Sequence, residues 1–207
     1  MPVVLVANPK GGSGKSTLAT HIAGYFASRG HPVMLGDVDR QQSSRLWLSL
    51  RPAQAAGIRG WEAQGQGSIV RPPAGTTHAV LDTPAGLHGW RFKEVLALAD
   101  KVVVPVQPSL FDIFATRDFL DRLAERLPGK RAPRIGLVGM RVGARTLAAE
   151  RLREFAMQMK MPLITELRET QNYVQLAAHG LTLFDLAPTR YERDLAQWQP
   201  LIQWLDD

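Results

Sequence analysis

The chain has 207 residues, no cysteine and a formal net charge of +6, and 45% of its residues are hydrophobic. This length suits one domain over residues 1–207, and the lack of cysteine excludes disulfide bonds, thiolate zinc sites and iron–sulfur clusters. No apolar run approaches the roughly 18 residues of a membrane span and the first residues resemble no signal peptide, so we expect a soluble, cytoplasmic protein.

The first predicted element is a short apolar strand that begins at Val3 and ends in a glycine-rich turn. The turn reads Asn8-Pro9-Lys10-Gly11-Gly12-Ser13-Gly14-Lys15-Ser16-Thr17, and a helix is predicted over 15–29. Glycines let consecutive backbone N–H groups point at one anion. Strand, glycine loop and helix together predict a phosphate-binding loop. Lys15 would contact the β- and γ-phosphates, and the Ser16 hydroxyl would ligate Mg²⁺.

Apolar runs rich in β-branched residues then alternate with helical patterns along the chain. The predicted strands cover 32–37, 79–82, 102–106 and 135–139, and the predicted helices cover 87–98, 110–127, 145–159, 170–179 and 189–199. This alternation predicts an α/β fold, a doubly wound and mainly parallel sheet with helices on both faces. Glycine and proline interrupt residues 50–78, which we expect to form a loop with at most one short helix.

Two helices have faces that the sequence predicts to be buried. In the helix over 110–127, the apolar residues at helical spacing are Leu110, Phe114, Phe119, Leu120, Leu123 and Leu127. Near the end of the chain, Trp198, Leu201, Ile202 and Leu205 predict a helix that packs on the domain and is interrupted at Pro200.

Acidic residues stand at the ends of two predicted strands. Asp37 and Asp39 are two residues apart and point the same way, toward whatever binds at the carboxyl edge of the sheet. Asp82 ends the next strand, which is the Walker B arrangement that holds Mg²⁺ directly or through water. Residues 83–86 after it would form a second switch segment that senses the γ-phosphate.

The loop departs from the usual pattern G-x-x-x-x-G-K-[ST], because Pro9 stands where its first glycine would be. With Lys10 it reads K-G-G-x-G-K-[ST] instead, which resembles the deviant Walker A loop of the ParA/MinD family of P-loop ATPases. The resemblance covers about residues 2–188 and is most specific in the first 90. In size the chain resembles the small ParA partition and positioning ATPases.

This resemblance implies the roles of the site residues. The segment from Asp37 to Gln41 matches the family's D-x-D-P-Q except at Arg40, and it implies that Asp39 orients the attacking water. Catalysis would involve Lys10, Lys15 and Asp39, and the Mg²⁺ shell would involve Ser16, Asp37, Asp39 and Asp82. ATP would contact Lys10, Gly11, Gly12, Ser13, Gly14, Lys15, Ser16 and Thr17, with Met140 and Arg141 near the base, where many members have an asparagine.

The resemblance further implies an ATP-dependent homodimer in which Lys10 reaches the partner's nucleotide. Such a dimer would bind DNA without sequence preference, associate with the nucleoid and be stimulated by a ParB-like activator. Residues 113–160 carry eleven Lys and Arg against five acids, which favours an anionic partner, and Arg168, Arg190 and Arg193 are further candidates.

Two alternatives remain open at this point. A MinD-like membrane-cycling ATPase needs a basic amphipathic helix at its C-terminus, but the last fourteen residues contain no Lys or Arg. A metabolic P-loop enzyme needs a second substrate site, and no motif for one is present.

Overall fold

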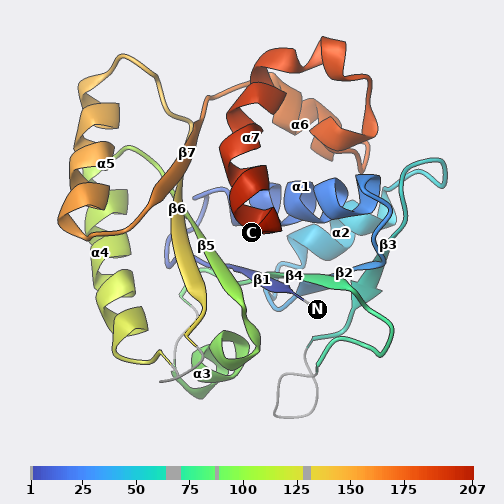
Figure 1. The fold of residues 1–207 in the computed structure, drawn as a ribbon, viewed down its shortest axis with the longest axis horizontal. Helices are drawn as coiled ribbons and strands as arrows, with labels where there is room; N and C mark the ends of the chain where they lie inside the picture. Colours follow the sequence, from blue (N-terminus) through green and yellow to red (C-terminus); the bar gives the residue numbers. More distant parts are fainter. Residues whose placement is uncertain (1, 64–70, 87–88, 128–131) are drawn as a thin grey trace.

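The computed structural model describes residues 2–63, 71–86, 89–127 and 132–207. Its centre is one parallel β-sheet with helices on both faces, so the predicted fold class is confirmed (Figure 1).

Within the described residues the sheet has seven strands in the order β3-β2-β4-β1-β5-β6-β7. In chain order they are β1 (Val3–Val6), β2 (Val33–Asp37), β3 (Ile58–Trp61), β4 (His78–Asp82), β5 (Lys101–Val106), β6 (Arg134–Met140) and β7 (Leu163–Leu167). All neighbouring strands pair in parallel, so their carboxyl ends meet at one edge of the sheet. The loop after β1 therefore lies at the middle of that edge.

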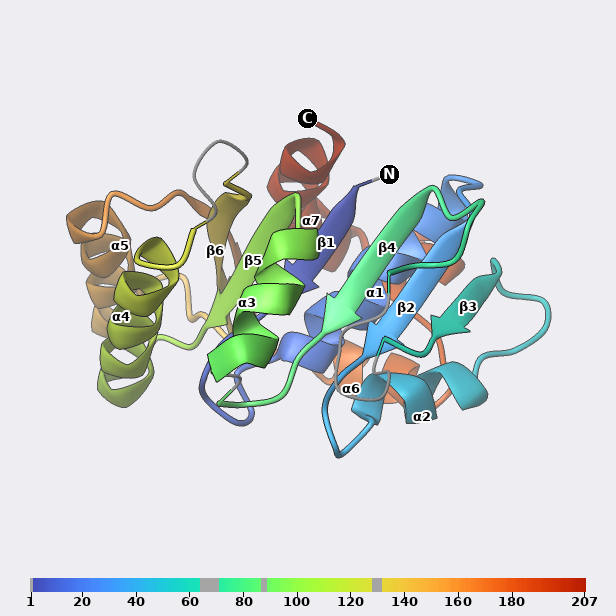
Figure 2. The ribbon, with the colours of Figure 1, turned by 90° about the horizontal axis from the view of Figure 1, so that it is seen from below.

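The helices form two layers. They are α1 (Lys15–Ser28), α2 (Ser43–Ser49), α3 (Gly89–Leu98), α4 (Leu110–Ala124), α5 (Leu147–Gln158), α6 (Gln171–Ala177) and α7 (Glu192–Asp206), with short 3-10 turns at Leu183–Asp185 and Pro188–Arg190. Figure 2 shows α3 in front of the sheet and α1 behind it. Side chains of α3, α4 and α5 share one apolar core, and those of α1, α2, α6 and α7 share the other. β1 serves both, because Leu5 faces the first core and Val4 the second.

The two edge strands were not predicted. Residues 50–78 were expected to form a loop, yet they contain β3, and no strand was predicted where β7 lies. An edge strand is half exposed, so its sequence is mixed: Arg59 and Gly60 are exposed in β3, and Glu166 is partly exposed in β7. The short helix α2 was also missed. The first two residues of the predicted helix over 87–98 lie outside the described residues, and α3 begins at Gly89.

The predicted break at Pro200 is wrong, because α7 continues through it to Asp206. A proline inside a helix costs about 3 kcal/mol, since it removes one backbone hydrogen bond and crowds the preceding turn. Here Trp198, Leu201 and Leu205 are each at most 4% exposed, so burial on both sides of the proline holds the helix together, and the predicted packing on the domain is confirmed.

One predicted buried face is partly wrong. On α4, Phe119, Leu120 and Leu123 are buried as expected, but Leu110 and Phe114 are 64% and 56% exposed. At about 100° per residue, both project from a different side of α4 than Phe119 and Leu123, whereas Thr116 in the same part of the helix is fully buried. Among the helices of the described residues, none is long and apolar enough to cross a bilayer.

Candidate nucleotide site

The glycine-rich loop between β1 and α1 has the backbone shape of an anion cradle. Gly12 and Gly14 have φ of +73° and +99°, a left-handed conformation that favours glycine. A Cβ on Gly11 or Gly12 would meet no atom within 4 Å, so this side of the loop is open. A Cβ on Gly14 would lie 2.6 Å from the Met140 side chain, which packs against the loop from β6.

The two lysines of the loop are in different environments. Lys15 is 8% exposed, and its Nζ donates a hydrogen bond to the Lys10 carbonyl at 2.8 Å. Burial lowers the pKa of Lys15, while the nearby carboxylates of Asp82 and Asp39 raise it. Lys10 is partly exposed, and its ammonium has no partner among the described residues. The loop therefore carries one enclosed cation and one cation that is available to an external group.

Neighbouring elements hold the loop in place through side-chain amides. The Asn8 Oδ1 accepts from the Lys10 amide at 2.8 Å, and its Nδ2 donates to the Thr116 hydroxyl on α4 at 3.0 Å. Gln107, after β5, donates to the Gly12 carbonyl at 2.6 Å. The phosphate loop is thus hydrogen-bonded both to α4, through Thr116, and to the segment that precedes α4, through Gln107.

The parallel register brings the acidic strand ends together, as predicted from the sequence. Asp82 pairs with Asp37 on one side and with Val6 on the other. Asp37 accepts three backbone amides, from Asp39 at 2.9 Å, from Ser44 at 2.9 Å and from Arg45 at 3.2 Å. Burial raises the pKa of Asp37 and these amides lower it. Its carboxylate fixes the segment between β2 and α2 and caps the start of α2.

Asp39 lies in the segment that Asp37 holds. It is partly exposed, and its Oδ1 accepts the Gln41 amide at 3.0 Å, which closes a short turn. The other oxygen of Asp39 has no hydrogen-bond partner among the described residues. This carboxylate is close enough to Lys15 to raise the pKa of the lysine.

Asp82 is the carboxylate that best fits a metal ion. It is 1% exposed, its Oδ2 accepts from the Ser44 hydroxyl at 2.7 Å, and its Oδ1 has no partner within the described residues. Burial raises the pKa of Asp82 to about 6, although the Ser16 and Ser44 hydroxyls lower it. A buried carboxylate oxygen without a partner is costly, and a divalent cation would supply one.

No three carboxylate or imidazole groups in the described part of the chain form a metal cluster by themselves. This agrees with Mg²⁺ chemistry, because that ion usually takes one or two protein ligands and completes its shell with phosphate oxygens and water. Asp82 and Ser16 suffice for such a site. Asp37 has both oxygens engaged by amides, which limits it to a supporting position.

A cavity of about 340 Å³ lies beside the phosphate loop. One wall is formed by Ser13, Gly14, Thr17, Met140 and Arg141, so both residues predicted near the base are found there. The other wall is formed by residues between Arg168 and Ala177, which belong to the segment that follows β7 and to α6. Sequence reasoning missed this wall. The only signal for it was the helix predicted over 170–179, which does not by itself indicate a ligand.

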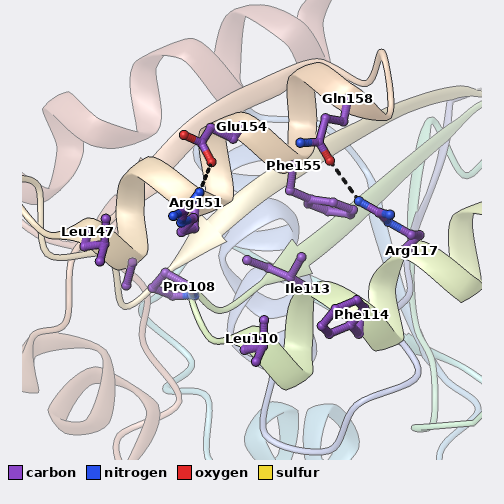
Figure 3. A pocket seen from close by; sticks show the side chains of 11 residues that line it. Pro108, Leu110, Ile113, Phe114, Arg117, Leu147, Arg151, Glu154, Phe155 and Gln158 are labelled. Atoms are coloured by element: carbon purple, nitrogen blue, oxygen red, sulfur yellow. Dashed lines mark hydrogen bonds and ion pairs between the residues drawn. The ribbon is translucent and has the colours of Figure 1, made fainter.

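A second cavity, of about 540 Å³, lies between α4 and α5. Figure 3 shows Leu110, Ile113 and Phe114 of α4 facing Leu147 and Phe155 of α5 across it. Two polar pairs line it: Arg151 with Glu154 within α5 at 2.8 Å, and Arg117 of α4 with Gln158 of α5 at 2.9 Å. The exposed residues of α4 that contradicted the predicted buried face therefore form the wall of a groove.

The chain resembles known nucleotide-binding proteins over most of its length. A family model described as the CobQ/CobB/MinD/ParA nucleotide binding domain matches residues 4–183, which leaves α7 outside the matched part. The maintenance of carboxysome distribution protein A of Gloeobacter kilaueensis is 33% identical over 118 residues, 54% of this chain and 51% of that protein. The chromosome-partitioning ATPase Soj of Thermus thermophilus is 29% identical over 186 residues, 72% of this chain and 73% of that protein.

Among solved structures, the cell division ATPase MinD of Pyrococcus furiosus superposes with a TM-score of 0.73 at 16% identity, covering 99% of each chain. At this identity the likeness concerns the fold. The chain spans about half the length of the first curated relatives that it matches.

Proposed function

Since this chain belongs to the CobQ/CobB/MinD/ParA family of nucleotide-binding proteins, we propose that it is a positioning ATPase. In this proposal it binds ATP with Mg²⁺, forms a homodimer around the nucleotide, and segregates or positions a cargo. A partner protein stimulates the hydrolysis.

One observation carries the proposal. The parallel register sets the phosphate loop, Asp82 and the segment of Asp37 and Asp39 side by side at the carboxyl edge, with the orphaned Oδ1 of Asp82 next to a buried lysine. Phosphoryl transfer to water requires a phosphate-binding loop, a site for a divalent cation and a carboxylate that orients the attacking water.

Each residue then has a distinct task. Lys15 and the loop amides neutralise the phosphates, which a bound Mg²⁺ also polarises and orients. Ser16 and Asp82 hold that ion. Asp39, with one oxygen free of protein partners, orients the attacking water, while Asp37 keeps the segment that carries Asp39 in position.

The unpartnered ammonium of Lys10 favours a dimer. Its backbone is fixed by Asn8 and Lys15, but its side chain has no partner within the described residues. A second subunit facing this edge would bring a triphosphate within its reach, so dimerisation becomes linked to the γ-phosphate. Positive charge added across the interface would stabilise the transition state of hydrolysis.

Light scattering with and without Mg·ATP, on the wild type and on Lys10→Ala, tests this proposal. We expect the wild type to dimerise only with ATP, and Lys10→Ala to bind ATP but remain monomeric and inactive. Lys93→Ala, a lysine of α3, is the matched control. Normal turnover and dimerisation in Lys10→Ala would remove the dimer mechanism and leave a one-subunit enzyme.

DNA binding belongs to the proposal, with a smaller set of candidate residues than the composition suggested. Four of the arginines are paired with carboxylates: Arg134 with Asp207, Arg151 with Glu154, Arg153 with Glu166 and Arg168 with Asp194. Arg122, Arg145 and Lys160 are exposed and have no carboxylate partner in the described part of the chain. Lys130 and Arg131 lie outside it.

A dimer making about six to eight phosphate contacts should lose about 10³–10⁵ in DNA affinity between 50 and 200 mM salt. Fluorescence anisotropy with two unrelated duplexes measures this. Binding that ignores salt or nucleotide would count against the DNA component alone.

The groove between α4 and α5 supports the part of the proposal in which a partner protein stimulates hydrolysis. Exposed Leu110, Phe114 and Leu147 suit the apolar face of an amphipathic helix. Since α4 is hydrogen-bonded to the phosphate loop through Thr116, and the segment before it through Gln107, a helix bound there could act on the loop. Phe114→Asp should abolish stimulation by the partner and leave unstimulated turnover intact.

The membrane alternative receives no support from α7. Its apolar residues Trp198, Leu201 and Leu205 are buried in the core and are not available to a bilayer. Sedimentation with anionic vesicles and ATP checks this point.

A further inference from the structure

The wall of the cavity that begins at Arg168 is held mainly by one face of α7. The side chains that hold it, Asp194, Gln197 and Trp198, are spaced i, i+3 and i+4 and therefore project from the same side of the helix. Within the described residues, every side-chain hydrogen bond that ties residues 168–173 to another element goes to one of these three.

Asp194 makes the strongest of these contacts. It is 1% exposed, its Oδ1 accepts from Arg168 Nε at 2.7 Å, and its Oδ2 accepts from Asn172 Nδ2 at 2.6 Å. Both oxygens of a buried carboxylate are therefore satisfied by donors from the two ends of the same short segment. Charge-assisted bonds of this kind are short and strong, so they fix the distance between Arg168 and Asn172.

Gln197 fixes the start of the segment in a second way. Its side-chain Oε1 accepts a hydrogen bond from the Arg168 backbone amide at 3.1 Å, and its backbone carbonyl accepts one from the Thr165 hydroxyl of β7 at 2.6 Å. The end of the edge strand and the first residue of the wall are both attached to one residue of α7.

Trp198 connects the wall to the phosphate loop helix. It is fully buried, its Nε1 donates to the Tyr173 hydroxyl at 3.0 Å, and its ring stacks on His21 of α1 with centroids 5.3 Å apart. The His21 Nδ1 in turn bonds to the Thr17 carbonyl at 2.9 Å. Tyr173 also meets His21 directly, with ring centroids 5.2 Å apart, so the wall is joined to α1 both through Trp198 and by this edge-to-face contact.

We propose that Asp194, Gln197 and Trp198 are positioning residues for base recognition: they set the wall from Arg168 to Tyr173 at the distance from the phosphate loop that accepts the base of the nucleotide. None of the three lines the cavity, so they act through Arg168, Asn172 and Tyr173. This inference rests on the proposed nucleotide site. It assigns part of that site's selectivity to a helix beyond the residues that the family model matches.

The test separates binding of the base from binding of the phosphates. Calorimetric titration with Mg·ATP and with Mg·tripolyphosphate gives two dissociation constants for each variant, and their ratio measures what the base contributes. In Asp194→Asn the new amide points a donor at either Arg168 or Asn172, so one bond is lost. We expect ATP to bind about tenfold more weakly while tripolyphosphate binding stays within about twofold.

Gln197→Ala and Gln199→Ala form a matched pair on the same helix. Gln199 is exposed and bonds to none of residues 168–173, so its removal should leave both constants unchanged, whereas Gln197→Ala should lower only ATP affinity. Asn172→Ala removes one of the two bonds to Asp194 and should fall between the wild type and Asp194→Asn. If Asp194→Asn fails to fold, Gln197→Ala and Asn172→Ala decide the question by the same ratio.

Three outcomes are possible. A rise in the dissociation constant for ATP alone supports the proposal. An unchanged ratio in the variants, whether both dissociation constants rise together or neither moves, overturns it and leaves α7 a purely structural helix. A wild type that binds neither ligand overturns the proposed nucleotide site, and this inference with it.

Discussion

Asp82 should make the protein less stable than it would be with a neutral side chain, and Asp82→Asn tests this directly. The residue is 1% exposed, and the described part of the chain offers its Oδ1 no partner. Asparagine has nearly the same shape, retains an oxygen that can accept from the Ser44 hydroxyl, and carries no charge.

The magnitude follows from the pKa. Burial raises the pKa of Asp82 from 3.8 to about 6, a difference of about two units, and each unit corresponds to about 1.4 kcal/mol. Between pH 4 and 6 the folded protein binds more protons at this site than the unfolded chain, so stability falls as pH rises through that window. Above pH 6 the full cost of about 3 kcal/mol applies. The substitution removes this cost, but the buried amide that replaces the carboxylate lacks an ideal partner and is itself destabilising. We therefore expect Asp82→Asn to be about 1–2 kcal/mol more stable than the wild type at pH 7.5.

Urea unfolding at pH 4 and at pH 7.5 gives the free energy of unfolding of the wild type and of Asp82→Asn. The difference between the two proteins is then compared at the two pH values. The gain from the substitution should be present at pH 7.5 and nearly absent at pH 4. Asp118→Asn, at an exposed carboxylate on α4, is the control and should show no such pattern. Mg·ATP should stabilise the wild type but not Asp82→Asn. If the substitution destabilises at pH 7.5, or its effect is the same at both pH values, the assignment of a buried charge at this site is refuted.

Three further predictions concern the site and its support. Lys15→Ala should lose ATP binding in a calorimetric titration, because the enclosed cation of the loop is removed. Asp39→Ala should bind ATP yet fail to hydrolyse it, so gel filtration should show a lasting ATP-bound dimer; rapid turnover would exclude Asp39 as the residue that orients water. Asp185→Ala should cost about 3–5 kcal/mol in urea unfolding, because it leaves Arg51, paired with Asp185 at 2.6 Å and nearly buried, without its carboxylate.

The central strands were predictable because burial on both faces leaves a plain signal. β1, β4, β5 and β6 read as apolar runs, and each lies between two other strands. Their order in the sheet could not be read from the sequence, since it depends on which strands pair. The carboxylates at the ends of β2 and β4 were nonetheless expected to meet, because all parallel strands end at one edge.

The parts that were missed depend on contacts between distant segments. β3 and β7 are edge strands whose mixed sequences gave no clear period. The helix α2 begins where the Asp37 carboxylate caps it, seven residues away from Ser44. Leu110 lies on a different face of α4 from the buried Phe119 and Leu123, so it does not share their cover. The wall of the base cavity is the largest omission, because its position is set by α7 and no local pattern encodes a bond between Asp194 and Arg168.

Two side chains of the proposed nucleotide site already have hydrogen-bond partners within the chain. Lys15 is bonded to the Lys10 carbonyl, and the Asp82 carboxylate is bonded to the Ser44 hydroxyl. Ser44, the second residue of α2, bonds only to Oδ2, so a Mg²⁺ ion would bind the free Oδ1 of Asp82 and leave this bond in place. Asp37 accepts the Ser44 amide and also fixes the segment that carries Asp39, the residue proposed to orient water. Ser44 therefore connects the carboxylate proposed to hold the cation with the segment that carries Asp39.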